Sequence, residues 1–270
     1  MRDVTVQAEI NYTGPMTSRP QFYANDRSLD RVVLDPRVVE VTDARSQLDR
    51  PRLDREGFAL IPHHTDVGDF RDTEEVGRVY PGEIRQLMLE LTGADDVVVT
   101  GPPILRFGER SAEAGTRDNS RAARLAHIDT SDETARQFAE MAAPPGKRPA
   151  RRIAQHNIWR AISPPPQDVP LAVCDARTVD RADLILADAM FDKDGQVRWS
   201  FEALLLRHSR THRWSFFSDM AQDEALVFKR HDTDPHAPLY VPHSAFSDPR
   251  VTATTPRASV EIRTIAFWYE

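Results

Sequence analysis

The sequence predicts a mainly β protein with flanking helices, of the antiparallel barrel or jelly-roll class. Short apolar runs with strand-like character recur along the chain, most densely after Arg152. Proline outnumbers glycine, 20 to 11, and the prolines punctuate these runs instead of forming one low-complexity tract. Many short strands separated by turns are typical of barrels and jelly rolls. A length of 270 residues suffices for a single domain with a buried core.

Residues 1–107 are expected to supply N-terminal strands and one helix. The first strand, residues 4–10, is apolar at every second position, which is typical of a strand with one buried face. Three further strands are expected at residues 32–34, 38–41 and 58–61. In residues 81–91 the apolar side chains fall at helical spacing instead. We expect a helix there, with Pro81 in its first turn and Gly93 as its stop.

Residues 108–125 are expected to form a loop that could act as a lid, because the segment is polar and has no apolar period. A second helix is expected immediately after it. Thr130 and Glu133 have the spacing of a capping box, and Ala135, Phe138 and Met141 follow at helical spacing.

Residues 126–270 are expected to form the jelly-roll core, within one domain that covers residues 1–270. Apolar runs bounded by turn residues predict most of its strands. These runs are residues 153–162, 171–174, 214–217, 225–229 and 258–268.

The charge and cysteine content exclude several classes of partner. Acidic residues outnumber basic ones, 42 to 35, so no global basic field attracts nucleic acid or an anionic membrane surface. Cys174 is the only cysteine, so an intrachain disulfide is excluded, and we expect it to be a small buried apolar residue. Residues 1–10 resemble neither a signal peptide nor a membrane span, so we expect a cytoplasmic protein. The oligomeric state is left open.

Two histidine-x-aspartate pairs are candidates for a metal site. In an extended segment, residues two apart point to the same face, so each pair could supply two ligands to one ion. The pairs are His64 with Asp66, and His127 with Asp129. Two histidines and one carboxylate leave open positions on iron(II), which is the coordination of nonheme iron oxygenases. A distant histidine must then complete the triad.

His243 is the expected third ligand. It precedes Arg257 and Ser259, which open the last predicted strand on one face and could hold the distal carboxylate of 2-oxoglutarate. We prefer His127 and Asp129 as its partners, because they precede the strand-rich half, whereas the His64 pair resembles a polar turn. Five other histidines lack a partner at ligand spacing, although His231 beside Asp232 could support the site from outside. They are His156, His208, His212, His231 and His236.

Several short motifs resemble the CmcJ/NvfI oxidoreductase family almost from end to end. They lie at residues 54–60, 157–160, 170–177, 212–214, 223–226, 243–249 and 257–263. This family includes the hydroxylating component of cephamycin methoxylation, fungal AsaB-like hydroxylases and gibberellin desaturases. It is similar to iron(II) and 2-oxoglutarate dioxygenases with a double-stranded β-helix (cupin-like) core. The family's Val-His-Asn-Asp motif corresponds here to residues 126–129, Ala-His-Ile-Asp.

The resemblance implies an oxygenase that uses iron(II), 2-oxoglutarate and dioxygen to hydroxylate or desaturate a small molecule in specialised metabolism. His127, Asp129 and His243 would then be the catalytic metal ligands. Asn157, which shares a strand face with Trp159, could bind the co-substrate or the substrate. The substrate itself is left open.

The roles of Arg160, Arg177 and Arg263 are also left open. Arg160 lies three residues after Asn157, so the two cannot face the same side of a regular strand. For Arg177 and Arg263 we favour a structural ion pair with an acidic neighbour. Arg263 lies roughly 20 Å beyond Arg257 by strand rise, too far to grip the same small co-substrate.

Two alternative functions are retained. One is a noncatalytic cupin-like protein that binds a small molecule, in which His127 and Asp129 make only hydrogen bonds. The other is a methyltransferase, as older family labels suggest. A methyltransferase should carry a glycine-rich loop between a strand and a helix for its adenosyl cofactor, and the sequence has none.

Overall fold

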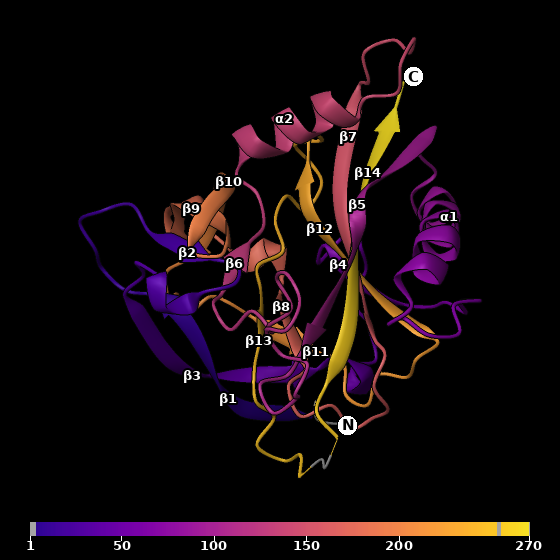
Figure 1. The fold of residues 1–270 in the computed structure, drawn as a ribbon. Coiled ribbons are helices and arrows are strands. Elements are labelled where there is room, and N and C mark those ends of the chain that lie inside the picture. The colour runs from indigo at the N-terminus through magenta and orange to yellow at the C-terminus, as the bar shows by residue number, and fades with distance from the viewer. Residues whose placement is uncertain (1–3, 253–254, 270) are drawn as a thin grey trace.

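Two β-sheets make up most of the molecule, of which this computed structural model describes residues 4–252 and 255–269 (Figure 1). The larger sheet contains, in spatial order, β1 (Thr5–Thr13), β3 (Leu34–Asp43), β11 (Trp214–Phe216), β8 (Leu171–Cys174), β13 (His243–Ala245), β6 (His127–Ile128), β10 (Gln196–Leu206), β9 (Leu184–Lys193) and β2 (Gln21–Tyr23). The smaller sheet contains β4 (Phe58–Pro62), β12 (Glu224–Asp232), β7 (Arg152–Ala161), β14 (Ala258–Trp268) and β5 (Asp96–Phe107).

The connections between the sheets are those of a jelly roll, as predicted. The chain passes from β6 to β7, back to β8, and later from β12 to β13 and β14, changing sheet at each of these steps. The two sheets face each other, because Val173 of β8 packs in one core cluster with Trp159 of β7 and Phe228 of β12. The inner faces of β6, β13, β7, β12 and β14 therefore surround a common interior.

The two α-helices begin at different residues from those predicted. Helix α1 (Thr73–Thr92) starts two turns before Pro81, which is inside the helix. Its start signal is Asp72, whose side chain accepts hydrogen bonds from the backbone of the first turn. Gly93 ends the helix as predicted, in a left-handed conformation. Helix α2 (Asp132–Ala142) is capped by Ser131 and not by Thr130.

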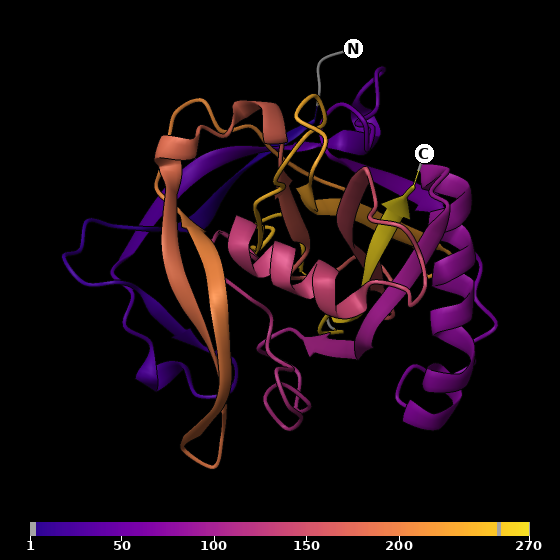
Figure 2. The same ribbon diagram turned by 90° about the horizontal axis from the view of Figure 1, so that it is seen from above.

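The helices cover different parts of the sheets. Val76, Tyr80 and Ile84 of α1 pack in one cluster with β14 residues, so α1 covers the outer face of the smaller sheet (Figure 2). Helix α2 follows Asp129 directly and packs on β10. Four 3-10 helices connect other elements: Arg27–Leu29, Ala44–Ser46, Ala176–Thr178 and Arg181–Asp183. Within the described residues, no helix is long and apolar enough to span a membrane.

Most predicted strands are present, and β8 and β14 have the predicted bounds. Residues 38–41 fall within strand β3, whereas of residues 32–34, predicted as a separate strand, only Leu34 belongs to it. Strand β5 was not predicted because Gly101 and two prolines interrupt its apolar pattern. It lies at the edge of the smaller sheet, where a strand tolerates proline. Thus β4 and β5 add N-terminal strands to the jelly-roll sheets.

The long hairpin of β9 and β10 was also missed. Its turn contains Asp194 and Gly195, both with positive φ, and this dipeptide is a common hairpin signal. Residues 108–125 contain no helix or strand, as predicted. They are tied to the end of β5 by backbone hydrogen bonds from Phe107 to Ser120 and from Ala122 to Phe107.

Candidate metal centre

His127, Asp129 and His243 converge at one point between the two sheets. Strands β6 and β13 are neighbours, and their register places His127 opposite His243. Oδ1 of Asp129 lies 3.4 Å from Nε2 of His127 and 3.6 Å from Nε2 of His243. Each of the three side chains offers one ligand atom, a ring nitrogen or a carboxylate oxygen, and these atoms all lie within 4.8 Å of one another. The three predicted ligand residues are therefore brought together.

Backbone carbonyls orient both imidazole rings. Nδ1 of His127 lies 2.7 Å from the carbonyl oxygen of Leu125, and Nδ1 of His243 lies 3.3 Å from that of Val241. Since a carbonyl can only accept, each Nδ1 carries the proton and donates it. In the neutral form of each ring, Nε2 is then the nitrogen with the free lone pair, and it lies next to Asp129. Burial and the adjacent His127 also lower the pKa of His243, which favours its neutral form.

The second carboxylate oxygen of Asp129 is held by two other strands. Oδ2 accepts a hydrogen bond from Nδ2 of Asn157 in β7 at 2.8 Å and one from Nε of Arg263 in β14 at 3.4 Å. Burial alone would raise the pKa of Asp129, but the positive charge of Arg263 holds it well below its usual range. Asp129 is therefore ionised, with Oδ1 directed at the histidines.

This donor set fits iron(II). Two neutral imidazole nitrogens and one carboxylate oxygen on one side form the facial triad of nonheme iron sites. Histidine ligands of metals usually donate their other ring N–H to a carbonyl or carboxylate, as His127 and His243 do here. Among residues 4–252 and 255–269, no other group of three such side chains comes as close together.

The rival pair, His64 and Asp66, has similar local geometry but different surroundings. Nε2 of His64 lies 3.5 Å from Oδ1 of Asp66, and both side chains are 84% exposed. The corresponding values are 10% and 11% for His127 and Asp129. No third ligand approaches the exposed pair within the described part of the chain.

Arg257 and Ser259 lie at the start of β14, and Arg257 is only 1% exposed. Nη1 of Arg257 donates to the carbonyl of Val169 at 3.0 Å, while Nε has no partner. Burial and the charge of Arg106 lower the pKa of Arg257 to about 10, so the guanidinium stays charged at neutral pH. Ser259 donates from Oγ to the carbonyl of Arg106 at 3.2 Å. No carboxylate of the described residues forms an ion pair with Arg257.

Arg160 and Arg177 lie away from the triad. Arg160 faces the opposite side of β7 from Asn157, where it packs against Tyr80 of α1 and bonds the carbonyl of His63. Arg177 forms ion pairs with Asp175 and Glu56, as expected. Arg263 does pair with an acidic neighbour, Glu261, but it also touches Asp129. It therefore belongs to the surroundings of the triad.

Sequence reasoning missed three charged residues near the triad: Arg106, Arg230 and Glu261. Glu261 could have been found, since it alternates with Ser259 and Arg263 on one face of β14. Arg230 had no such signal, because it lies in β12 beside an irregularity in the pairing with β7. His231, expected as a possible support of the site, lies instead 3.3 Å from Asp132 at the start of α2. Cys174 is fully buried, as predicted.

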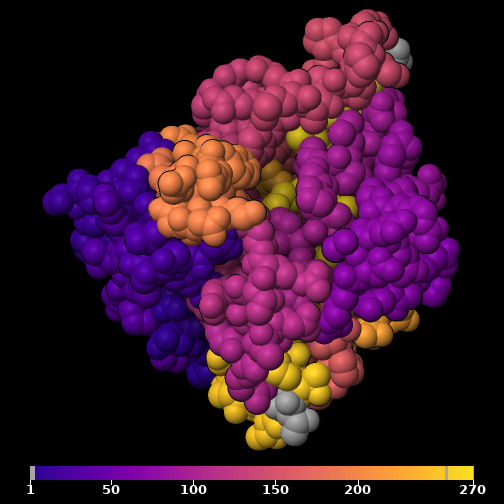
Figure 3. Space-filling view, in the orientation of Figure 1, coloured from indigo at the N-terminus to yellow at the C-terminus, as the bar shows by residue number. Residues whose placement is uncertain are grey.

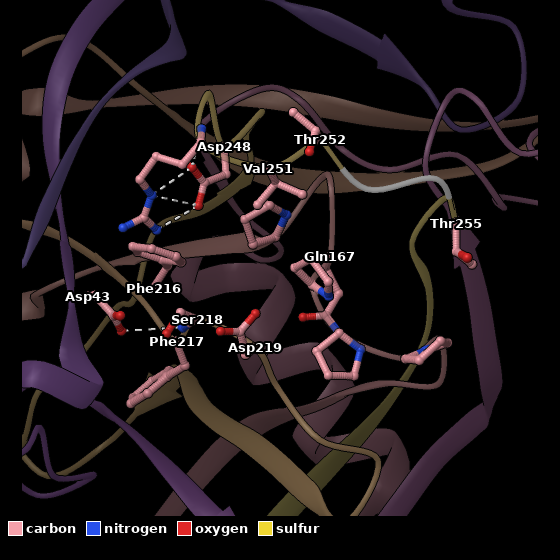
Figure 4. A pocket seen from close by; sticks show the side chains of 15 residues that line it. Asp43, Gln167, Phe216, Phe217, Ser218, Asp219, Asp248, Val251, Thr252 and Thr255 are labelled. Atoms are coloured by element: carbon pink, nitrogen blue, oxygen red, sulfur yellow. Dashed lines mark hydrogen bonds and ion pairs between the residues drawn. The ribbon is translucent and has the colours of Figure 1, made fainter.

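A large hollow lies elsewhere on the molecule. It has a volume of about 630 Å³ and is lined by residues that include Gln167, Phe217 and Asp248, but by no member of the triad (Figure 4). In the space-filling view, atoms of β14 are visible in a recess framed by α2, the β9–β10 hairpin and β5 (Figure 3). Side chains at this end retain partial exposure, since Arg263 is 24% exposed.

Comparisons with known proteins agree on one family. Residues 10–267 match the family described as Oxidoreductase/YMDC permease-like domain. The hydroxylase/desaturase efuI of Hormonema carpetanum is 30% identical over 88% of this chain and 86% of its own. The Fe(II)/2-oxoglutarate-dependent dioxygenase nvfI of Aspergillus novofumigatus is 27% identical over 86% and 84%. A solved structure of the iron and alpha-ketoglutarate-dependent endoperoxidase NvfI shares the fold, with a TM-score of 0.83 at 24% identity over 100% of both chains.

Proposed function

The chain belongs to the Oxidoreductase/YMDC permease-like family, and from this membership we propose its reaction and the residues that carry it. It is an oxygenase of the hydroxylase/desaturase class that depends on iron(II), 2-oxoglutarate and dioxygen, as its relatives' names indicate. Its substrate is a small molecule, and we assign the reaction to specialised metabolism. The observation that carries the proposal is the convergence of His127, Asp129 and His243.

His127, Asp129 and His243 hold the iron. When bound there, iron(II) would activate dioxygen, which is the oxidant: two of its four oxidising equivalents would be spent on 2-oxoglutarate and two on the substrate. The carbonyls of Leu125 and Val241 keep both histidine Nε2 atoms free of protons and aimed at the ion. Three protein ligands of this kind would leave coordination positions of the metal for co-substrate, dioxygen and solvent.

Asn157 and Arg263 determine which carboxylate oxygen of Asp129 is free to bind the metal. Both donate to Oδ2, so this oxygen is occupied and Oδ1 alone is directed at the ion. A carboxylate that binds through one oxygen leaves more coordination positions open than one that binds through two. We therefore assign Asn157 to orienting Asp129, in place of the contact with co-substrate or substrate that the sequence suggested.

Arg257 and Ser259 hold the distal carboxylate of 2-oxoglutarate. Arg257 is a buried cation without an ion-pair partner among the described residues, and its Nε has no acceptor. Buried charges in proteins are normally paired, so this guanidinium calls for an anion. Ser259 lies two residues along the same face of β14 and offers a hydroxyl there.

The proposal extends to domain organisation and setting. Residues 1–270 form one domain, since N-terminal strands β4 and β5 complete the sheet that contains β7, β12 and β14. Residues 108–125 act as a lid. The protein works in the cytoplasm without nucleic acid or membrane partners, in keeping with its net charge of −7.

An anaerobic titration tests the proposal. Iron(II) is added to the metal-free protein, and 2-oxoglutarate is then added while the charge-transfer absorbance of the iron complex is followed. We expect saturation near one iron and one oxo acid per chain, and succinate after admission of air. The Asp129→Ala variant should show neither the absorbance nor succinate. Stoichiometric iron without the absorbance or succinate would contradict an oxygenase and favour the noncatalytic binding protein.

A further inference from the structure

Arg230 of β12 is a buried arginine whose guanidinium lacks partners. The residue is 2% exposed. Nη2 donates to Oε1 of Gln155 at 3.1 Å, but neither Nε nor Nη1 has a hydrogen-bond partner among the described residues. These two nitrogens carry most of the N–H donors of the group. Burial lowers the pKa of Arg230 to about 10, so it is still charged at neutral pH.

Arg160 shows how this fold satisfies an arginine that is only structural. It is also fully buried, yet its guanidinium contacts Tyr80, His63 and the carbonyl of Gln222. Buried polar groups in proteins nearly always find such partners. The guanidinium of Arg230 has one hydrogen-bond acceptor, the amide oxygen of Gln155. Its Nε and Nη1 find no acceptor among the described residues, so they require one from a bound molecule.

Asp129 does not fill this requirement. Its Oδ2 is the carboxylate oxygen that forms the recorded ion pair with Arg230, but it lies 3.9 Å from Nε, beyond hydrogen-bond distance. The same oxygen already accepts from Asn157 and Arg263. A metal ion on Oδ1 would withdraw negative charge from it further. Arg230 thus lies next to the metal ligands, and its Nε and Nη1 still lack a hydrogen-bond acceptor among the described residues.

The position of Arg230 is set by β12. Phe228, two residues earlier, lies opposite Asn157 in the sheet, and its ring is 4.7 Å from that of His243. The strand pairing is irregular between Lys229 and His231, and such irregularities re-aim a side chain. Asn157 Oδ1 also has no hydrogen-bond partner. Unused donors of Arg230 and an unused acceptor of Asn157 therefore occur around the same carboxylate, Asp129.

We propose that Arg230 binds a carboxylate, or an equivalent oxyanion, of a small molecule bound beside the metal centre. The proposal rests on the oxygenase function and narrows its ligand class. Guanidinium groups bind carboxylates through charge-assisted hydrogen bonds, roughly twice as strong as neutral ones. The oxyanion has two possible sources, the metal-side carboxylate of 2-oxoglutarate or an acidic group of the substrate. This oxyanion is distinct from the distal carboxylate of 2-oxoglutarate, which we assign to Arg257.

Calorimetry on the iron(II)-loaded protein under anaerobic conditions distinguishes the two sources. The variants are Arg230→Met, which keeps the length of the side chain without its charge, and Arg136→Met, an exposed control on α2. The first titrant is 2-oxoglutarate. The second, added to protein saturated with 2-oxoglutarate, is benzoate, with neutral benzamide as its comparison.

If the co-substrate is the source, Arg230→Met weakens 2-oxoglutarate binding at least tenfold. If the substrate is the source, 2-oxoglutarate binding changes less than twofold, and the preference for benzoate over benzamide disappears in Arg230→Met. Either result supports the proposal, provided that Arg136→Met behaves as wild type. The proposal is overturned if Arg230→Met binds 2-oxoglutarate as wild type does and the wild type shows no preference for benzoate over benzamide.

A second measurement covers an Arg230→Met variant that does not fold. The NMR signal of the Arg230 Nε–H group is followed in metal-free wild-type protein during titration with sodium acetate, against sodium chloride at equal ionic strength. A saturable shift specific to acetate supports the proposal, and its absence contradicts it. This readout requires neither iron nor turnover, so a failure of the oxygenase assignment would be recognised separately.

Discussion

The two histidine-x-aspartate pairs of this protein are alike in sequence and in local geometry, and they differ in their surroundings. His64 and Asp66 follow the short strand β4 and are 84% exposed, whereas His127 and Asp129 lie between two sheets with about a tenth of each side chain exposed. Both pairs have the histidine nitrogen within 3.5 Å of the carboxylate. The His-x-Asp spacing therefore brings the histidine close to the carboxylate in both pairs, but only His127 and Asp129 are part of a candidate metal site.

The difference lies in what the rest of the fold brings to each pair. Strand β13 places His243 opposite His127, while β7 and β14 supply donors to the far oxygen of Asp129. Burial also restricts the side chains and strengthens each charge interaction. The side chains of the exposed pair, His64 and Asp66, can change rotamer and form hydrogen bonds with water instead of with each other. A metal centre thus depends on preorganisation by strands that are distant in sequence.

The largest expected effect separates the two pairs directly. His127→Ala should reduce iron(II) affinity by more than the ~10–100-fold typical for loss of a residue that supports a ligand, because a ligand itself is lost. Equilibrium dialysis of iron(II) under anaerobic conditions measures this. His64→Ala is the matched control and should bind as wild type. Loss of iron in His64→Ala alone would move the metal site to the exposed pair.

The next effect concerns the buried arginine at the start of β14. Arg257→Ala should weaken 2-oxoglutarate binding by on the order of a hundredfold or more while iron binding is retained, since one partner of a buried charge pair is removed. Arg257→Lys should restore little, because an ammonium does not reproduce the planar fork. Anaerobic titration of each iron-loaded variant measures the affinity.

Arg52, with 58% of its side chain exposed, provides the control for Arg257. Arg52→Ala should leave the affinity for 2-oxoglutarate unchanged. Arg263→Ala is the more informative comparison, since Arg263 contacts Asp129 and not Arg257. A large loss of 2-oxoglutarate affinity in Arg263→Ala, with none in Arg257→Ala, would transfer the carboxylate-binding role to Arg263.

A smaller effect is expected from the residue that orients Asp129. Asn157→Ala removes the 2.8 Å hydrogen bond to Oδ2 but none of the three proposed ligands. We expect iron(II) affinity to fall by about 10–100-fold, the usual range for such support. Affinity within twofold of wild type would show that Arg263 alone suffices to hold Asp129.

The smallest effect concerns His156, a buried histidine outside the proposed metal site, and tests how burial lowers its pKa. His156 in β7 is 1% exposed, and burial together with the charge of Lys229 lowers its pKa to about 3. Its unfolded pKa is near 6.5, so the unfolded chain takes up a proton first as the pH falls. Stability contributed by neutral His156 is therefore present above pH 6.5 and is lost progressively toward pH 3.

Replacing His156 removes this dependence. Between pH 7 and pH 5, the free energy of unfolding of His156→Gln should fall by about 2 kcal/mol less than that of wild type. Urea unfolding at the two pH values measures the difference. Parallel profiles of wild type and His156→Gln would contradict a depressed pKa.

The sequence by itself determined features that depend on neighbours along the chain. Strands β8 and β14 were predicted to the residue, because their apolar runs end at turn residues. Alternation also placed Asn157 and Arg160 on opposite faces of β7. The predicted N-cap of α2, Thr130, was wrong by one residue, because the adjacent Ser131 also has a hydroxyl that can cap the helix and does so. The His-x-Asp motif and late His243 came from order in the chain and family resemblance.

Only the tertiary structure decided which faces meet. A strand period assigns a side chain to one of two faces, but it does not say which distant strand lies opposite. The sequence preferred His127 over His64 by its place in the chain, but only the pairing of β6 with β13 put His243 opposite His127. The crossing of β12 and β14 over the same interior brought Arg230 and Arg263 to Asp129, although they are separated from it by over one hundred positions. Such convergence depends on sheet closure, which no local pattern encodes.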